Sequence, residues 1–238
     1  MAAARDADAP VRRRDPDGTR HDILTVATSE FAANGYAGAR VDEIAELTQT
    51  TKRMIYYYFG SKEGLYLAVM EAAYRGIREL EHGLDVAGLS PVDALRRLAE
   101  TTYDHHTSHR DFVRLVQIEN VHRAEHLGKS TAIHEMGSTA IETLRDVLER
   151  GVASGELRAD VDALDVHAII SSYAIFHVAN RYTFRALFGR DLLDADRHEH
   201  YRHLAGELVV GFMTAHERST GPTPGTDGVA PSPPSHGG

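Results

Sequence analysis

Proline is nearly absent from the central part of this chain. Of the eight prolines, two lie before residue 17, five lie after residue 220, and Pro91 alone lies between. Proline removes a backbone donor and clashes with the preceding helical turn, so a run of about 200 residues with one proline is typical of helices. Pro91 follows Ser90 and precedes Asp93, an order that predicts an N-cap, a first helical position and an acidic first turn. We therefore expect an all-α fold.

Apolar residues recur with helical spacing and divide this central part into about nine helices. The first is expected to begin at Thr19, which forms a capping pair with Asp22, and to stop near Gly35. Asp160 is expected to cap a helix that runs into the 180s. No alternation of apolar and polar residues favours a strand. The other helices are expected over residues 41–47, 52–58, 61–82, 91–107, 111–123, 131–150 and 196–216.

Composition changes at both ends of the chain. The last 20 residues are rich in Gly, Pro, Ser and Thr, and the first residues lack apolar periodicity and include three consecutive arginines at positions 12–14. Both ends are expected to be disordered, because neither can bury a core. The expected organisation is a tail over residues 1–17, a first domain over residues 18–73, a second over residues 74–218, and a tail over residues 219–238.

Several classes of protein and of site do not fit this composition. The chain has no cysteine, which excludes disulfides and thiolate metal sites. Its first residues lack the apolar stretch of a secretory signal, and no apolar run reaches the length of about 18 residues that a membrane helix needs. We therefore expect no membrane partner and a cytoplasmic location.

Charge is unevenly distributed along the chain. The net charge is −9, but residues 1–64 hold 9 basic and 10 acidic side chains, whereas the rest hold 17 and 25. Residues 48–62 contain Lys52, Arg53 and Lys62 and no acidic residue. Such a cluster either faces the phosphates of a nucleic acid or is an ordinary solvated patch.

Two short helices, over residues 41–47 and 52–58, are expected to form a helix-turn-helix. Helices this short are marginal alone and need the flanking helices as supports. Such a compact group presents its second helix outward, where it can enter the major groove of DNA. The expected buried residues are Val41, Ile44, Ala45 and Leu47 in the first helix, and Ile55 and Phe59 in and just past the second.

The outward residues of the second short helix suit contact with DNA. Lys52, Arg53 and Met54 lie at its start, nearest to base edges, and arginine pairs bidentately with guanine. Thr51 is the expected N-cap and a further candidate for a phosphate contact. Tyrosine hydroxyls bind phosphate oxygens, and three successive residues span about 200° of a helix, so they cannot all face a core. These tyrosines are Tyr56, Tyr57 and Tyr58, and burial of Tyr57 alone is the alternative.

Four segments between residues 19 and 69 form a recognisable pattern: Ile23-Leu24, Phe31-Ala32-Ala33-Asn34-Gly35-Tyr36, Val41-Asp42-Glu43-Ile44-Ala45 and, above all, Ile55-Tyr56-Tyr57-Tyr58-Phe59-Gly60-Ser61-Lys62-Glu63-Gly64-Leu65. With these segments, residues 19–69 resemble the N-terminal DNA-binding domain of the TetR family of bacterial regulators. The resemblance implies a homodimeric DNA-binding protein, usually a repressor, whose C-terminal domain binds a small-molecule effector. The positions that hold the phosphate backbone in the family match Tyr56, Tyr58 and Lys62, and those that reach base edges match Lys52, Arg53 and Met54.

This chain departs from the family pattern at two places. Gln49 stands where the turn between the two helices usually has glycine. Ala39 and Arg40 stand where Thr or Ser usually caps the first helix, which Asp42 and Glu43 offset in part. Arg40 is a further candidate for a phosphate contact.

The segment after residue 74 shows no enzyme signature: no phosphate-binding glycine loop, no nucleophile elbow and no His-Glu-x-x-His motif. We therefore expect a sensor rather than an enzyme, with no cofactor. Polar residues set among apolar ones are candidates to contact the effector, because their burial costs free energy unless they find a partner. A neighbouring side chain could equally be that partner. The candidates are Asn120, His122, Tyr173, His177 and Asn180.

Histidine is frequent, with 15 in the chain. His105 and His109 are four residues apart, as are His122 and His126, with Glu119 one turn earlier. This spacing puts both imidazoles of a pair on one helical face, where they could supply two metal ligands. Surface polarity is the simpler interpretation, and no metal site is predicted. The alternative functions are a metal sensor of the same fold and, from another class, a helical enzyme or binding protein whose N-terminal helices are only structural.

The last two expected helices are candidates for the dimer interface, which the resembling family builds from the same two helices. An intramolecular core would produce the same pattern. Two recognition helices related by a twofold axis need inverted half-sites, so the expected partner is double-stranded DNA with a palindromic operator. The apolar residues concerned are Val166, Ile169, Ile170, Tyr173, Phe176 and His177 in one helix, and Tyr201, Leu204, Leu208, Phe212 and Ala215 in the other.

Overall fold

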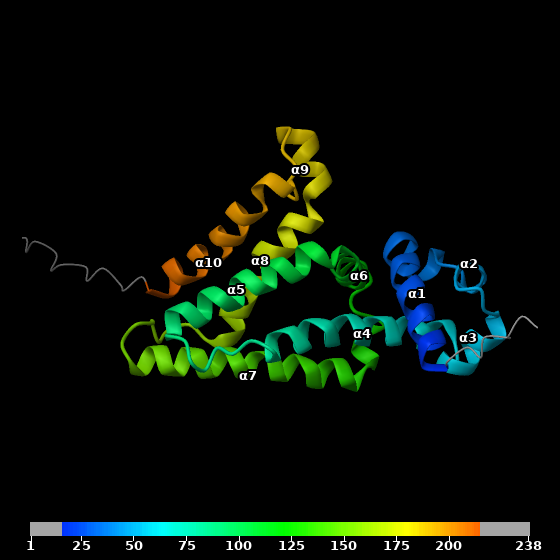
Figure 1. The fold of residues 1–238 in the computed structure, drawn as a ribbon, viewed down its shortest axis with the longest axis horizontal. Helices are drawn as coiled ribbons and strands as arrows, with labels where there is room; N and C mark the ends of the chain where they lie inside the picture. Colours follow the sequence, from blue (N-terminus) through cyan, green and yellow to red (C-terminus); the bar gives the residue numbers. More distant parts are fainter. Residues whose placement is uncertain (1–15, 215–238) are drawn as a thin grey trace, which may run out of the picture.

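The computed structural model describes residues 16–214, which form an all-α structure (Figure 1). No strand occurs within that range, so the expected fold class is confirmed. None of the helices in it is long and apolar enough to cross a membrane. The helices are α1 (Pro16–Gly38), α2 (Val41–Leu47), α3 (Lys52–Phe59), α4 (Lys62–His82), α5 (Pro91–Ser108), α6 (Arg110–Val121), η1 (Leu127–Lys129), α7 (Thr131–Ala153), α8 (Ala163–Ala179), α9 (Arg181–Phe188), η2 (Ala195–Arg197) and α10 (His198–Thr214).

Side chains cap the starts of α4 and α5 as the sequence predicts. Ser61 accepts a hydrogen bond from Gly64 N at 3.0 Å at the start of α4. Ser90 accepts one from Asp93 N at 3.1 Å, and Pro91 is the first residue of α5. Each cap satisfies an amide that the first helical turn leaves without a partner, and both predicted starts are confirmed.

α1 begins earlier than expected, at Pro16 rather than Thr19. Proline suits the first position of a helix because that position needs no amide donor. The expected N-terminal tail therefore ends before Pro16, and the rest of it lies outside the described residues, as does the expected C-terminal tail. The predicted stop near Gly35 appears as a break inside α1, where Gly35 has a φ of 68° and a ψ of 175°.

The expected helix from Asp160 into the 180s is wrong in two respects. Asp162 caps α8, because its carboxylate accepts a hydrogen bond from Asp165 N at 2.9 Å. Asp160 instead pairs with Arg158 at 2.6 Å. The chain then breaks at Asn180, and α9 is a separate helix that turns away from α8 (Figure 1).

α1, α2 and α3 gather at one end of the molecule, and α4 runs from them alongside α7 toward the other helices (Figure 1). Their core includes Ile23, Phe31 and Ile44, and it continues into Leu115 of α6 and Ile133 of α7. A second core lies among α5, α7, α8 and α10. The N-terminal helices therefore share buried contacts with the rest of the chain, and α4 is continuous across the boundary expected between residues 73 and 74.

The turn between α2 and α3 contains a strained residue. Gln49 has a φ of 51°, in the left-handed region that a β-carbon disfavours. Backbone bonds from Gln49 N to Glu46 O and from Thr50 N to Ala45 O, at 3.1 and 2.9 Å, hold the turn closed. This geometry explains physically why the resembling family usually has glycine here.

We expect Gln49→Gly to raise the free energy of unfolding by about 0.5–1 kcal/mol, because glycine removes the left-handed strain at a smaller entropic cost. Urea denaturation would show a higher midpoint with an unchanged slope. Gln49→Ala is the control, since it removes the same side chain and keeps the β-carbon, and it should not stabilise. A midpoint for Gln49→Gly at or below that of the unmodified protein would contradict the strain argument.

Candidate nucleic-acid interface

α3 turns one residue toward the core and most of its surface toward solvent. Ile55 is fully buried, whereas Lys52 and Arg53 are exposed and Met54 is 37% exposed. Thr51 caps the helix by accepting a hydrogen bond from Met54 N at 3.2 Å, as predicted. The cap and the single buried anchor hold the first turn of α3 so that its basic side chains face outward.

The three tyrosines of α3 differ in exposure. Tyr57 is 78% exposed, so the alternative that it belongs to the core is wrong. Tyr56 is 37% exposed. Tyr58 is the one that packs inward, against the N-terminal core, with its ring 6.2 Å from that of Phe59. All three tyrosines therefore remain candidates for contacts with DNA, but only Tyr56 and Tyr57 are exposed.

α2 supports α3 through Val41, Ile44 and Ala45, which are buried as predicted. Leu47, also expected in the core, is 68% exposed because it is the last residue of α2 and turns away. Arg40 occupies the N-cap of α2 without a side-chain capping bond.

The missing cap of α2 is replaced in part by α1. Glu30 accepts a hydrogen bond from Arg40 N at 3.2 Å. The Arg40 guanidinium lies 3.5 Å from Glu43, on the outer face of α2. Arg40 is therefore exposed at the start of α2 and remains a candidate for the predicted phosphate contact.

Two of the predicted basic contacts already have partners in this structure. Lys52 Nζ lies 3.1 Å from Asp42 of α2. Lys62 Nζ donates to Ala37 O at 3.3 Å and lies 5.0 Å from the ring centre of Tyr36. Both ammonium groups are surface groups, so exchanging these partners for phosphate oxygens costs little.

The buried carboxylate of Glu119, noted in the sequence only for its spacing to His122 and His126, joins α6 to α4. Glu119 is 3% exposed and accepts hydrogen bonds from Tyr66 Oη of α4 at 3.0 Å, from Leu127 N at 2.9 Å and from His126 N at 3.2 Å. Burial alone would raise the pKa of Glu119, but these hydrogen bonds outweigh it and hold the pKa below its ordinary value. The carboxylate therefore stays ionised at neutral pH.

The same network corrects the expectation for the second histidine pair. His126 is buried and its Nδ1 donates to Glu119 at 3.1 Å, whereas His122 is exposed. They do not share a face because Arg123 and Ala124, between them, have φ values of 58° and 56° and end the helix. Among the side chains that the structure describes, no three from His, Asp or Glu converge as a metal site would require.

The first histidine pair is packed rather than open. His105 is buried and stacks on exposed His109, with ring centres 4.2 Å apart and an interplanar angle of 17°. Burial, helped by His109 and His106, lowers the pKa of His105 to about 3. The imidazole is therefore neutral at pH 7, and its Nε2 is buried without a hydrogen-bond partner.

The five candidate effector contacts lie in different places. Tyr173 and His177 meet in an aromatic cluster with Tyr103 and Tyr201, and their polar groups are satisfied there. Tyr173 Oη donates to Tyr201 O at 3.1 Å, and His177 Nδ1 donates to Tyr173 O at 2.9 Å. Asn180 follows the end of α8. Asn120 and His122 are exposed at the far end of α6, so the five candidates lie apart from one another in this structure.

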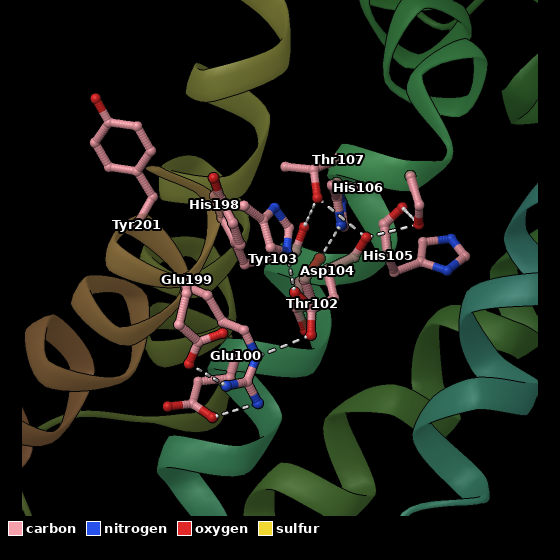
Figure 2. A network of polar contacts seen from close by, with 12 residues as sticks. Glu100, Thr102, Tyr103, Asp104, His105, His106, Thr107, His198, Glu199 and Tyr201 are labelled. Carbon is pink, nitrogen blue, oxygen red and sulfur yellow. Dashed lines mark hydrogen bonds and ion pairs between the residues drawn. The ribbon is translucent and has the colours of Figure 1, made fainter. Parts of the chain in front are cut away.

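Charged groups around Asp104 tie α5 to α10 (Figure 2). His198 Nε2 and Arg202 Nε donate to Asp104 at 2.9 and 3.0 Å. Arg202 also lies 2.8 Å from Glu100 and 3.2 Å from Glu199. This network fixes the rotation of α10, and with it which side of that helix faces solvent.

A cavity of about 860 Å³ lies where α1, α4 and the α5–α6 turn meet. Leu24 lines it from α1, Ala73 and Gly76 from α4, His105 from the end of α5 and Phe112 from the start of α6. This volume is in the range of small-molecule sites. None of the five candidate effector residues lines it.

Two family models match this chain. Residues 23–69 match a model described as bacterial regulatory proteins, tetR family, and residues 91–209 match one described as tetracyclin repressor-like, C-terminal domain. The HTH-type transcriptional repressor NicS from Pseudomonas putida is 35% identical over 184 residues, which cover 77% of this chain and 87% of NicS.

Solved structures are similar across most of the chain. A crystal structure of SCO4942 from Streptomyces coelicolor has a TM-score of 0.62 at 28% identity, and the match covers 82% of this chain and 98% of that one. The regulator FadR from Bacillus subtilis, in complex with stearoyl-CoA, has a TM-score of 0.58 at 18% identity over 78% of this chain and 96% of that one, which shows the fold alone. With the exposed, capped α3 and both family models in place, this chain belongs to the TetR family of bacterial transcriptional regulators.

Proposed function

We propose that this protein is a repressor that binds a palindromic operator as a homodimer and is released by a small-molecule effector. The observation that carries the proposal is the exposed face of α3, where Lys52, Arg53 and Tyr57 stand on a helix anchored by one buried residue. Repression rather than activation is supported by the 35% identity to NicS.

Mobility shift and footprinting on the DNA upstream of this protein's own gene test the proposal. A dimer should protect two inverted half-sites about one helical turn apart. If the protein leaves every tested fragment of that region unprotected, the N-terminal helices serve structure only.

Within the operator complex we assign two kinds of contact to the exposed residues. Lys52, Arg53 and Met54, at the start of α3, face base edges. Phosphate oxygens are bound by the remaining polar groups, whose positions surround that first turn. These are Arg40, Thr51, Tyr56, Tyr57, Tyr58 and Lys62.

Arg53→Ala should relax preference at one base pair per half-site and cost about 1–3 kcal/mol on the preferred site. Tyr56→Phe combined with Lys62→Ala should instead weaken binding to all sequences alike and lower the salt dependence. Selection from random DNA, with binding measured at several salt concentrations, distinguishes the two. An unchanged selected motif for Arg53→Ala would remove that residue from base recognition.

We propose that α8 and α10 form the dimer interface. Each helix carries a stripe of side chains, largely apolar, that stays exposed to solvent in the single chain. α8 is apolar around most of its circumference, a pattern typical of a helix buried on more than one side. Its inner side packs in the protomer, whereas Leu164 and Phe176 are 62% and 45% exposed. On α10, Leu204, Leu208 and Phe212 are 39%, 49% and 37% exposed.

The proposed stripes differ in part from the residues singled out in the sequence. Val166, Ile170 and His177 of α8, and Tyr201 of α10, are buried within the protomer. These residues belong to the intramolecular core, which the sequence left open as the alternative to a dimer interface. The exposed α8 stripe is offset by two positions from Val166 and Ile170, and its members are Leu164, Ala168, Ser172 and Phe176, of which Phe176 was singled out in the sequence. Ala215 lies outside the described residues.

Leu208→Arg should convert the dimer to monomers, because a charge in a buried apolar seam costs several kcal/mol unless it is paired. Operator affinity should then fall toward the nonspecific level while helicity stays unchanged. Val121→Arg is the control, since Val121 is 79% exposed on α6, outside both stripes. Sedimentation showing an intact Leu208→Arg dimer would place the interface elsewhere.

We propose that the effector occupies the cavity between α1, α4 and the α5–α6 turn. His105 lines this cavity and its buried Nε2 has no hydrogen-bond partner, and an unpaired buried polar atom is costly unless something binds it. The absence of a side chain at Gly76 leaves room beside His105, whose Cε1 would lie 4.0 Å from a β-carbon there. An occupant would touch α1 directly.

Release from the operator then requires the effector to favour a different placement of α1 and α4. α4 begins beside α3 and continues along the cavity, so a shift of its axis moves the recognition helix. A tenfold loss of operator affinity needs a coupling free energy of about 1.4 kcal/mol. No group of ligating side chains in the described residues favours the metal-sensor alternative.

A further inference from the structure

α9 is a helix of eight residues, Arg181–Phe188, none of which is buried. Leu187 and Phe188 are 75% and 68% exposed. A helix this short is marginal alone, and large apolar side chains gathered on a surface mark a place where another molecule binds. α9 stands at the end of α8 that points away from α7 (Figure 1). Its apolar end is left to solvent in the single chain.

α9 is nevertheless held firmly at its base. Arg181 Nε and Nη2 donate to the two carboxylate oxygens of Asp191 at 2.8 and 2.7 Å. Such a bidentate pair fixes geometry as well as adding energy. It also lowers the pKa of Asp191 to about 2, so the pair persists at neutral pH. The exposed end of α9 is therefore presented in one position.

The aromatic row of α9 continues the α8 stripe. Phe176 is the last member of that stripe, and Phe184 and Phe188 follow it beyond the break at Asn180. The ring centres of Phe176 and Phe184 are 6.2 Å apart, and those of Phe184 and Phe188 are 4.7 Å apart. We call the exposed pair Leu187 and Phe188 the α9 knob.

A groove of about 470 Å³ lies at the other end of α8, between the start of that helix and the end of α7. Leu164, the first member of the α8 stripe, lines it together with Leu148, Val152 and Val161. A cavity of about 150 Å³ can hold a benzene ring, so this groove has room for a phenyl ring and a leucine side chain. Its size and its apolar wall therefore suit the α9 knob of a second copy.

The end of α8 next to α9 is basic. Residues 181–190 contain three arginines and no acidic residue. Asp191 neutralises Arg181 and lies 4.0 Å from Arg185. Arg185 and Arg190 are both exposed, so positive charge lies beside the α9 knob.

The end of α8 next to the groove is acidic. Residues 159–165 contain three aspartates and no basic residue, although Arg158 pairs with the first of them. Glu149 and Arg145 line the groove and add one charge of each sign. Asp165 is exposed in the first turn of α8. A basic knob and an acidic groove are complementary, and such complementarity fixes the register in which two surfaces meet.

Twofold symmetry allows α8 to pair with its copy in two directions. Parallel pairing would set Arg185 and Arg190 against the same two arginines of the second copy. Antiparallel pairing sets them against the acidic end of the other α8 instead, which the charges favour. When the two stripes overlap fully in this direction, Leu164 faces Phe176 of the partner subunit. The helix that follows Phe176 then meets the groove beside Leu164 of the partner subunit.

We propose that the α9 knob of each protomer inserts into the groove between α7 and α8 of its partner. This inference rests on the proposed dimer interface, because the α8 stripes bring the two surfaces together. Insertion covers Leu187 and Phe188 and places Arg185 and Arg190 beside the acidic end of the partner's α8. The contact is made twice in each dimer, and it fixes the antiparallel arrangement of the two α8 helices.

Charge reversal tests which surfaces meet. Arg185→Glu with Arg190→Glu reverses the basic end, and Glu149→Lys with Asp165→Lys reverses the acidic end. Each pair of substitutions should raise the dissociation constant of the dimer about tenfold or more, because the contact is made twice and like charges then oppose each other. The chain that carries all four substitutions should dimerise within about threefold of the unmodified protein, because its charges are again complementary. Sedimentation over a range of concentrations measures each constant.

Phe188→Ala tests the apolar part of the contact. It should weaken the dimer about tenfold, because each groove loses a buried ring. Tyr182→Ala is the control, since Tyr182 is 63% exposed on the same helix but its hydroxyl accepts a hydrogen bond from Arg114 of α6. The control should dimerise as the unmodified protein does, and helicity should be the same in every variant.

Unchanged dissociation of the Phe188→Ala dimer would overturn the proposal, and it is the result expected if the groove holds a small molecule or another protein instead. A charge-reversed α9 that the reversed groove does not restore would also overturn it, because the knob would then lie on another surface. Failure of the proposed α8–α10 interface gives a different result, since Leu208→Arg would then remain a dimer.

Discussion

The buried carboxylate of Glu119 is the contact on which the arrangement of the two ends of the molecule depends. It accepts hydrogen bonds from a side chain of α4 and from two backbone amides of the loop after α6. A carboxylate buried to 3% exposure is costly unless its oxygens are satisfied, and here they are. Removing any one donor leaves the buried negative charge of Glu119 with fewer hydrogen bonds, which costs free energy. The network therefore fixes the loop after α6 relative to α4.

Other contacts also join the N-terminal helices to the rest of the chain. Ser130, the N-cap of α7, donates to Glu71 of α4 at 2.7 Å. Tyr36 of α1 packs on His126, with ring centres 4.2 Å apart. The N-terminal core takes in Leu115 and Ile133 from beyond α4. The helices that present α3 are therefore not a separate body on a tether, and a change in the position of α4 or α6 moves the proposed DNA contacts directly.

Local chemistry explains which parts of the structure could be predicted from sequence. Ser61, Ser90 and Thr51 act within one helical turn of themselves, so their capping roles follow from spacing alone. Asp160 and Asp162 are both suitable caps by residue type; in the structure Asp162 caps α8 and Asp160 pairs with Arg158, a distinction that residue type alone does not make. The fold class and the exposed face of α3 follow from periodicity, whereas the phase of the α8 stripe depends on how that helix packs against α5 and α10.

Glu119 shows why a buried network escapes prediction from spacing. Its position relative to His122 and His126 suggested two ligands of a metal, because a continuous helix would align them. Two successive left-handed residues, Arg123 and Ala124, end the helix and turn His126 inward instead. The partner that completes the network, Tyr66, is 53 residues away in the chain, and nothing in the local pattern points to it.

Calorimetric unfolding of the unmodified protein and of Glu119→Gln tests the central claim most directly, which is that this carboxylate makes the N-terminal helices and the rest of the chain one cooperative unit. Glutamine keeps the shape but loses the charge and offers an amide donor toward Tyr66 and the loop amides. The account predicts one transition for the unmodified protein and two for the variant, with the N-terminal helices unfolding first. Two transitions in the unmodified protein, or a single unshifted transition in the variant, would contradict it.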